Sequence, residues 1–312
     1  MLNTVHLYTF LTVVELGTYS AAAERLHLTQ PAVSQQIGLL EKQLGDVRLF
    51  RRVAQRMVLT HAGEELLPAA REIVALAERT EEALLSLRGQ VTGRVTIACT
   101  PASGERMLPG VLAAFRQRWP AVELILTVGP AEQVLLWLDS GQAQIGWIDE
   151  PQRRRGWESI HIGREVLVCC VGSQHPWLND DPITLGMIRE QPLILPRYGT
   201  MMRRVIDESL RRAGLPASEI TVALECDSVT ATVAAIQAGL GIGFVPLSCQ
   251  PAQREVGSVA LGGFQVALDW YVVGSKDASL GRAVHDCRAF LASREAAQLL
   301  KHHGINSEAT HH

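Results

Sequence analysis

"LTQPAVSQQI", residues 28–37, contains the start of a helix whose outer positions are polar but uncharged. Thr29 is expected to cap this helix, and Pro31 falls in its first turn, where a missing backbone N–H breaks no intrahelical hydrogen bond. The apolar stripe that the helix buries repeats every three or four residues and consists of Val33, Ile37, Leu40 and Leu44. The opposite face carries Pro31, Ser34, Gln35, Gly38 and Lys42.

Two shorter helices are predicted before it. Residues 4–16 carry apolar side chains at helical spacing, and Gly17 ends the run. A second helix follows, for which we expect Ser20 to be the cap and Ala22, Ala23 and Leu26 to be the inner face. His27 and Leu28 then form a tight turn.

A basic hairpin is predicted after Gly45, which ends the third helix. Residues 47–60, VRLFRRVAQRMVLT, alternate apolar and basic side chains over two short runs. Arg51, Arg52 and Arg56 lie at the tip or flanks of this hairpin. Short helices, a tight turn and a basic wing predict a winged helix-turn-helix over residues 1–60.

The uncharged helix face is suited to reading base edges. Glutamine can pair bidentately with adenine and serine can donate or accept, so Gln30, Pro31, Ser34 and Gln35 are the readout candidates. Thr29 and the first-turn amides suit a phosphate. Salt-dependent contacts to the DNA backbone are expected from Lys42, Arg51, Arg52 and Arg56. The competing interpretation is an ordinary solvated helix, with arginines that serve solubility.

Residues 61–90 are predicted to form a long dimerisation helix. Apolar positions recur at alternating steps of four and three residues, through Leu66, Ala70, Ile73, Ala77, Thr80, Leu84 and Leu87. The alternative is one amphipathic helix lying on its own domain.

Residues 91–300 alternate strands and helices, which indicates α/β architecture. We expect two lobes around a cleft, with crossings after Ile148 and near Gln265: lobe I comprises 91–163 and 266–300, and lobe II comprises 164–265. Residues 301–312, a polar tail with four histidines, are expected to be disordered.

An effector site is predicted where helices begin at the cleft. Thr100, Ala102 and Ser103 follow the first strand and start a helix, which can present hydroxyls and free amides. The second lobe offers Arg197, Gly199 and Thr200 before a helix whose first turn holds Arg203 and Arg204. Cations at a helix start are disfavoured by the helix dipole, which favours a bound anion there. The competing interpretation is that Arg203 and Arg204 only face solvent.

Three further side chains are candidates for the cleft wall. These are Gln133, Trp147 and Asp149, with a core position as the alternative for the tryptophan. We therefore expect a small anionic effector such as a carboxylate, a phosphorylated metabolite or an inorganic oxyanion.

Composition excludes several classes of protein. A hydrophobic content of 47% over 312 residues excludes a disordered chain. The net charge is −3, but residues 1–60 hold six basic and four acidic side chains, so they carry +2 and the rest −5. No basic region precedes the first apolar residues and no apolar run is long enough to span a membrane, so we expect a cytoplasmic protein without a membrane partner.

No enzyme is expected from the motifs. GxSxG, HExxH and P-loop patterns do not occur, and neither a catalytic nor a metal site is predicted. The six cysteines show no CxxC spacing. A thiol redox sensor is disfavoured, because Cys169 and Cys170 are adjacent on a strand and point to opposite faces.

At this point the chain resembles the LysR-type transcriptional regulators. The resemblance rests on SAAAERLHLTQPAVSQQIGLLEKQLGDVRLFRR at 20–52, on LTHAGEELL at 59–67 and on AIQAGLGIGFVP at 235–246. It covers residues 3 to 295 and looks loosely nearest the branch that regulates carbon, sulfur or nitrogen assimilation. Arg51 stands where the family often has an acid, and Asp46 adds a charge before the wing.

The resemblance implies a sequence-specific regulator that binds a double-stranded DNA operator as a dimer, commonly a tetramer. It also implies a C-terminal module shaped like a periplasmic solute-binding protein, a small effector instead of a cofactor, and RNA polymerase as a further partner. Two alternatives remain from other classes. A free solute-binding protein would lack the DNA-binding end, and an architectural DNA-binding protein would not need a two-lobed ligand domain.

Overall fold

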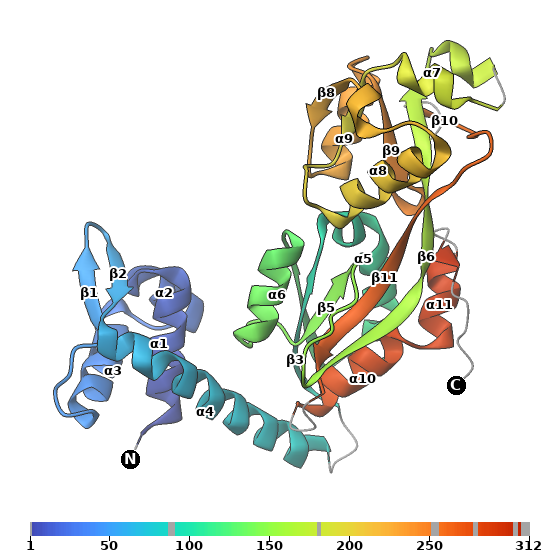
Figure 1. Cartoon of the computed structure of the whole chain (residues 1–312). Coiled ribbons are helices and arrows are strands. Elements are labelled where there is room, and N and C mark those ends of the chain that lie inside the picture. The colour runs from blue at the N-terminus through green and yellow to red at the C-terminus, as the bar shows by residue number, and fades with distance from the viewer. Residues whose placement is uncertain are drawn as a thin grey trace. The chain divides into compact units, whose positions relative to one another are not determined.

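The chain forms two compact units in a computed structural model (Figure 1). The N-terminal unit is Met1–Gly93 and the C-terminal unit is Arg94–His312. The structure describes residues 2–86, 91–179, 182–250, 256–276, 280–301 and 305–306.

The N-terminal unit is a winged helix-turn-helix followed by a long helix, as predicted. Its elements are α1 (Thr4–Leu16), α2 (Tyr19–Leu26), α3 (Gln30–Gln43), β1 (Phe50–Val53), β2 (Arg56–Leu59) and α4 (His61–Ser86). The wing is the antiparallel hairpin of β1 and β2. Gly17 ends α1 in the left-handed region, with φ of 73°.

The predicted cap of α2 is wrong. Thr18, not Ser20, accepts the hydrogen bond from the Ala21 backbone N–H, at 3.1 Å. Because α2 begins at Tyr19, directly after the turn at Gly17, Ser20 already lies inside the first turn. Thr18 and Ser20 both carry a hydroxyl that can cap a helix, and the turn at Gly17 places Thr18 at the cap position.

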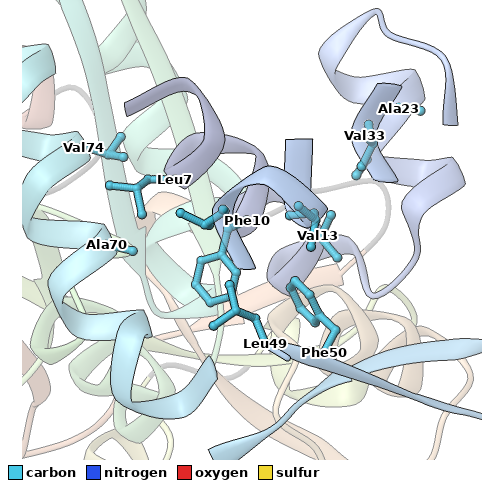
Figure 2. Packing of buried hydrophobic residues seen from close by; sticks show 12 residues of the cluster. Leu7, Phe10, Val13, Ala23, Val33, Leu49, Phe50, Ala70 and Val74 are labelled. Carbon is cyan, nitrogen blue, oxygen red and sulfur yellow. The ribbon is translucent and has the colours of Figure 1, made fainter. Parts of the chain in front are cut away.

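One apolar core joins α1, α2, α3, the wing and the first half of α4. Leu7, Phe10 and Val13 of α1 are buried at its centre, and the ring centroids of Phe10 and Phe50 lie 5.2 Å apart. Figure 2 shows Ala70 and Val74 of α4 in the same cluster as Leu7.

The first half of the long helix packs on its own domain, which was the alternative interpretation of its pattern. Ala70 is fully buried against its own domain, whereas Leu76 and Leu84 are 58% and 61% exposed.

Two positions of the predicted apolar stripes differ from the expectation or cannot be checked. Leu44, placed by the pattern on the stripe of α3, lies just past the end of that helix and is half-buried. Leu87, the last position of the predicted repeat, lies outside the described residues.

The C-terminal unit contains one mixed sheet with helices packed on it (Figure 1). Its strands are β3 (Gly93–Cys99), β4 (Val122–Val128), β5 (Ile145–Ile148), β6 (Trp157–Gly172), β7 (Leu193–Leu195), β8 (Val222–Glu225), β9 (Ile242–Pro246), β10 (Val256–Val259), β11 (Val266–Ser275) and β12 (Ile305–Asn306). Its α-helices are α5 (Pro101–Arg118), α6 (Ala131–Asp139), α7 (Leu185–Arg189), α8 (Met201–Ala213), α9 (Val229–Gln237), α10 (Arg282–Leu291) and α11 (Arg294–Lys301), and its 3₁₀ turns are Pro176–Asn179, Ala217–Glu219 and Leu247–Cys249.

Two long strands take part in both halves of the sheet. The strand order is β4-β3-β5-β11-β6-β9-β7-β8, and β10 and β12 also pair with β6. β11 pairs with β5 and with residues 157–167 of β6, and the far end of β6 pairs with β9 and β10. The boundary predicted between residues 163 and 164 therefore falls inside β6.

The predicted disordered tail is wrong in part. Lys301 is the last residue of α11, and Ile305 is fully buried where β12 pairs with β6. The prediction overlooked Ile305, an apolar residue within a mostly polar C-terminal segment. The four histidines of the predicted tail, at 302, 303, 311 and 312, lie outside the described residues. Among the helices that the structure describes, none combines the length and hydropathy needed to cross a bilayer.

Candidate nucleic-acid interface and effector site

The outer face of α3 is exposed, and it is uncharged over the first turns, with Lys42 near the end of the helix. Thr29 caps the helix by accepting a hydrogen bond from the Ala32 N–H at 3.4 Å, and Pro31 lies in the first turn. Val33, Ile37 and Leu40 are buried, which fixes the rotation of the helix. The predicted readout and phosphate residues on this helix are all exposed: Thr29, Gln30, Pro31, Ser34, Gln35 and Lys42.

Gln36 and Gln35 are adjacent, but their side chains have different surroundings. The Thr9 hydroxyl of α1 donates to the Gln36 amide oxygen, which ties Gln36 to the interior of the domain. Gln35 has no such tie to a described residue and stands exposed. The face available for a ligand therefore carries Gln35 alone of this pair.

The wing exposes three arginines. In the register of the hairpin Arg51 lies opposite Val58, Arg52 opposite Met57 and Arg56 opposite Val53. Arg51, Arg52 and Arg56 are all exposed, and none forms an ion pair with a described residue. Such guanidinium groups can neutralise phosphates without first giving up a carboxylate.

A buried carboxylate fixes the wing to α3. Glu41 is 6% exposed and accepts hydrogen bonds from the Leu49 N–H at 2.9 Å and from Arg48 Nη1 at 2.8 Å. The Met57 N–H donates to the Gly17 carbonyl at 2.7 Å and ties β2 to the end of α1. Glu41 was not among the predicted site residues, although a single acid next to the apolar stripe of a helix was a signal for it.

The start of α5 holds a buried hydroxyl without a partner. Thr100 is 7% exposed, and its Oγ1 meets no hydrogen-bond partner among the described residues. Its backbone N–H donates to the Trp147 carbonyl at 3.3 Å. The indole N–H of Trp147 is equally buried and unpartnered within the described part of the chain. Buried polar groups are normally satisfied, so each of these two groups is a candidate to bond to a ligand.

The other two residues predicted in this turn are inside the fold. Ser103 is fully buried, and its hydroxyl donates to the Thr100 carbonyl at 2.9 Å. Ala102 is 9% exposed, and its backbone carbonyl accepts a hydrogen bond from the Cys249 thiol at 3.3 Å. Thr100 therefore offers the free hydroxyl of this group.

Thr200 caps α8 on the second half of the sheet. Its hydroxyl accepts from the Arg203 N–H at 3.2 Å and donates to the Arg197 carbonyl at 2.9 Å. Gly199 adopts a left-handed φ of 93° in the turn before it. Arg197, whose side chain is 72% exposed, pairs with Asp227 at 2.9 Å. No hydrogen bond or ion pair between described residues joins Arg197 or Thr200 to Thr100 or Ser103.

The charge argument that pointed to an anion at α8 is wrong. Arg203 is 8% exposed and pairs with Asp207 at 2.9 Å and with Glu225 at 2.8 Å. Arg204 pairs with Glu150 at 3.2 Å. Carboxylates of this chain therefore offset both cations at the start of α8, and a bound anion is not needed to explain them.

The three predicted wall residues differ in exposure. Trp147 is fully buried, whereas Gln133 and Asp149 are half-buried. Burial raises the pKa of the Asp149 carboxyl to about 6, and the neighbouring charge of Glu150 acts in the same direction. Asp149 is thus partly protonated in slightly acidic solution.

Two contacts missed by our sequence analysis join α5 to α9. Glu105 accepts a hydrogen bond from the Thr230 hydroxyl at 2.6 Å and another from Ser228 at 3.4 Å. A cavity of about 350 Å³ lies beside them and is lined by residues of α5, α9 and Cys249, not by the predicted effector residues. The partners of Glu105 lie more than a hundred residues away, so no local pattern signals them.

The thiols are mostly buried. Burial raises the pKa of Cys99 and Cys249 to about 11 and that of Cys170 and Cys287 to about 12, and it raises the pKa of Cys169 as well. These five thiols are poor nucleophiles near neutral pH. The described residues contain no cluster of His, Cys, Asp or Glu that could hold a metal ion.

Two family models match the chain. The bacterial regulatory helix-turn-helix protein model of the lysR family matches residues 4–64, and the LysR substrate binding domain model matches residues 88–296.

Individual relatives agree with these matches. The chain is 28% identical to the HTH-type transcriptional activator CmpR of Synechocystis over 92% of its own length and 94% of the relative. It is 32% identical to a probable RuBisCO transcriptional regulator of Cyanophora paradoxa, over 77% and 75% of the two chains. Among solved structures, full-length CbnR complexed with its target DNA is 28% identical, with a TM-score of 0.65 over 93% of this chain and all of that one. The protein therefore belongs to the LysR family of DNA-binding transcriptional regulators, with a helix-turn-helix domain and an effector-binding domain.

Proposed function

We propose that this regulator reads its operator with the exposed face of α3 in the major groove of double-stranded DNA. Gln30, Ser34 and Gln35 bond to base edges, with Pro31 packed beside them. Thr29 and the first-turn amides hold a phosphate, and Lys42 with the wing arginines 51, 52 and 56 supplies the sequence-independent attraction.

The observation that supports this proposal is the fixed orientation of an uncharged polar face. Burial of Val33, Ile37 and Leu40 aims Ser34 and Gln35 outward. Neutral side chains gain little from phosphate charge, so their benefit is hydrogen bonding to bases.

In vitro selection from a random-sequence duplex library tests the proposal. We expect the full-length protein to enrich one interrupted inverted repeat. Enrichment of no sequence over random competitor would refute sequence-specific binding, whatever the effector domain holds.

We infer that the protein binds its operator as a dimer, commonly assembled into a tetramer, through α4. The exposed side of that helix carries Leu76 and Leu84, which are 58% and 61% exposed. Paired helices bury such positions. Sedimentation of the Leu76→Glu/Leu84→Glu variant should show smaller particles than the wild type, and an unchanged sedimentation coefficient would exclude α4 as the interface.

We also propose a small anionic effector at the start of α5. Support comes from the unpartnered Thr100 hydroxyl at a helix N-terminus and from Arg197, whose ion pair with Asp227 is exposed enough to exchange partners. Gly199, Thr200, Gln133, Trp147 and Asp149 complete the proposed site, with Ala102 and Ser103 shaping the turn. Calorimetric titration with carboxylates, phosphorylated metabolites and oxyanions tests it against Arg197→Ala and Thr100→Val. Binding that both variants leave unchanged would remove the site from α5.

The target genes are proposed from the relatives. The similarity to CmpR and to RuBisCO regulators favours genes of carbon assimilation. We propose that the bound protein acts on RNA polymerase in the cytoplasm, where the chromosome is, and that it has no membrane partner. Transcription in vitro from a selected operator, with and without the protein, checks this: an unchanged transcript level would exclude an action on the polymerase.

A further inference from the structure

Three consecutive arginines lie in the loop between β5 and β6 of the C-terminal unit. Arg153, Arg154 and Arg155 are all exposed. They stand out because residues 61–312 together carry a net charge of −5.

The loop has a defined conformation. Gln152 and Ser159 exchange two hydrogen bonds, at 2.8 Å and 3.1 Å. The Trp157 N–H closes a turn on the Arg154 carbonyl at 3.1 Å, and Gly156 supplies the left-handed φ of 80° that such a turn requires. Arg155 therefore lies at the tip of the turn.

Arg154 has an internal partner, in contrast to its two neighbours. Its guanidinium binds Asp139 at 2.6 Å and lies over the Trp157 ring, 5.1 Å from the centroid. Arg153 and Arg155 form no ion pair with any residue in the described ranges. Arg154 is thus held by contacts within the unit, whereas Arg153 and Arg155 on either side of it are exposed and form no ion pair with a described residue.

Three nearby carboxylates are already paired with other cations. Asp139 pairs with Arg154, Glu150 with Arg204 at 3.2 Å, and Glu158 with Arg288 at 3.9 Å. Within the described residues, neither Arg153 nor Arg155 has a carboxylate partner of its own, so both guanidinium groups are available to a ligand.

We propose that Arg153 and Arg155 bind the phosphate backbone of DNA that flanks the operator, as a second contact beyond the helix-turn-helix. This inference rests on the operator binding proposed above. Phosphate contacts need only exposed, unpaired guanidinium groups. A protein partner would instead bury an apolar centre, and the loop residues 150–160 include no large exposed hydrophobic side chain, although Leu136 of the neighbouring α6 is 59% exposed.

The test compares two lengths of operator DNA at several salt concentrations. The short duplex ends at the selected sequence, and the long one adds two helical turns, about 21 base pairs, on each side. We measure binding of the full-length wild type, of Arg153→Ala/Arg155→Ala and of a matched control, Arg211→Ala/Arg212→Ala. The control removes two exposed adjacent arginines of α8 that pair with Glu208.

Loss of two phosphate contacts per protomer reduces the magnitude of the slope of log K against log salt by about 1.8 for each protomer, and thus by about 3.6 for a bound dimer. Between about 50 and 200 mM salt the ratio of wild-type to variant affinity then changes about tenfold for each bound protomer, or about a hundredfold for the dimer. We expect this on the long duplex only, with the short duplex and the control unchanged.

Three results would overturn the inference. The first is equal binding of wild type and variant to the long duplex. The second is an equal loss on both duplexes, which would place the loop away from the flanks. The third is unchanged DNA binding with weaker self-association or weaker transcription activation, which would assign the loop to a protein partner. If the selection enriches no operator, the proposed function fails first, and that outcome differs from all three.

Discussion

Replacing the buried Glu41 by alanine should weaken the attachment of the wing to α3. The carboxylate satisfies the buried Leu49 N–H at 2.9 Å and binds Arg48 at 2.8 Å. A buried donor left without a partner costs about 1–3 kcal/mol. The Arg48 side chain is 81% exposed, so its ion pair contributes less than about 1 kcal/mol. We expect Glu41→Ala to destabilise the N-terminal unit by about 2 kcal/mol.

Two comparison variants separate the contributions. Glu41→Gln keeps an oxygen that can accept from the Leu49 N–H, so it should cost about 1 kcal/mol. Arg48→Ala removes only the exposed ion pair and should cost about 0.5 kcal/mol.

The two units can be followed separately during thermal unfolding. All six tryptophans lie between residues 119 and 270, so tryptophan fluorescence reports the C-terminal unit, whereas far-ultraviolet circular dichroism reports both. A loss of about 2 kcal/mol in a unit of this size lowers its transition by about 8 °C or more. The circular dichroism transition should move while the fluorescence transition stays. The reasoning is refuted if Glu41→Ala is as mild as Arg48→Ala.

Three further predictions concern the C-terminal unit. Because the pKa of native Asp149 is about 6 against an ordinary 3.8, the native state binds more protons between these values, and its stability falls as pH rises from about 4 to 6. Asp149→Asn should therefore stabilise the unit by about 1–2 kcal/mol at pH 8 and remove this dependence of stability on pH, as measured by fluorescence-detected urea unfolding. An unchanged pH dependence in the variant would contradict the raised pKa of Asp149. Arg203→Ala should cost about 2–3 kcal/mol and Arg204→Ala less than about 1 kcal/mol in the same assay, because the first side chain is 9% exposed and the second 59%; equal costs would contradict this assignment. A maleimide should label the folded chain at Cys226 only, since the other five cysteines are buried, and mass spectrometry that finds rapid labelling of a second thiol would be inconsistent with that burial.

The fold of the N-terminal unit was predictable because its signals are local. The cap at Thr29, the proline in the first turn and the buried stripe through Val33 and Ile37 all lie within a few residues of one another. The position of one cap was not predictable, since Thr18 and Ser20 are chemically similar and only the turn at Gly17 selects between them.

The charge balance at the effector domain could not be predicted, because it depends on residues far apart in the chain. The partner of Arg204 is 54 residues away and one partner of Arg203 is 22 residues away. Sequence pattern gives the position of a cation on a helix but not the carboxylate that the fold brings to it. The same limit applies to Ile305, whose strand pairs with residues 164 and 165 of β6.

Base reading by α3 is tested best by the specificity ratio of Gln35→Ala. Binding to the selected operator and to random competitor is measured for the wild type, for this variant and for Gln43→Ala, which removes an exposed glutamine at the other end of α3. A bidentate contact to a base contributes about 1–3 kcal/mol of discrimination. We expect Gln35→Ala to lower the ratio about tenfold and to leave the nonspecific affinity at the wild-type value, and we expect Gln43→Ala to change neither. A ratio for Gln35→Ala equal to that of the wild type would contradict base reading by this face of the helix.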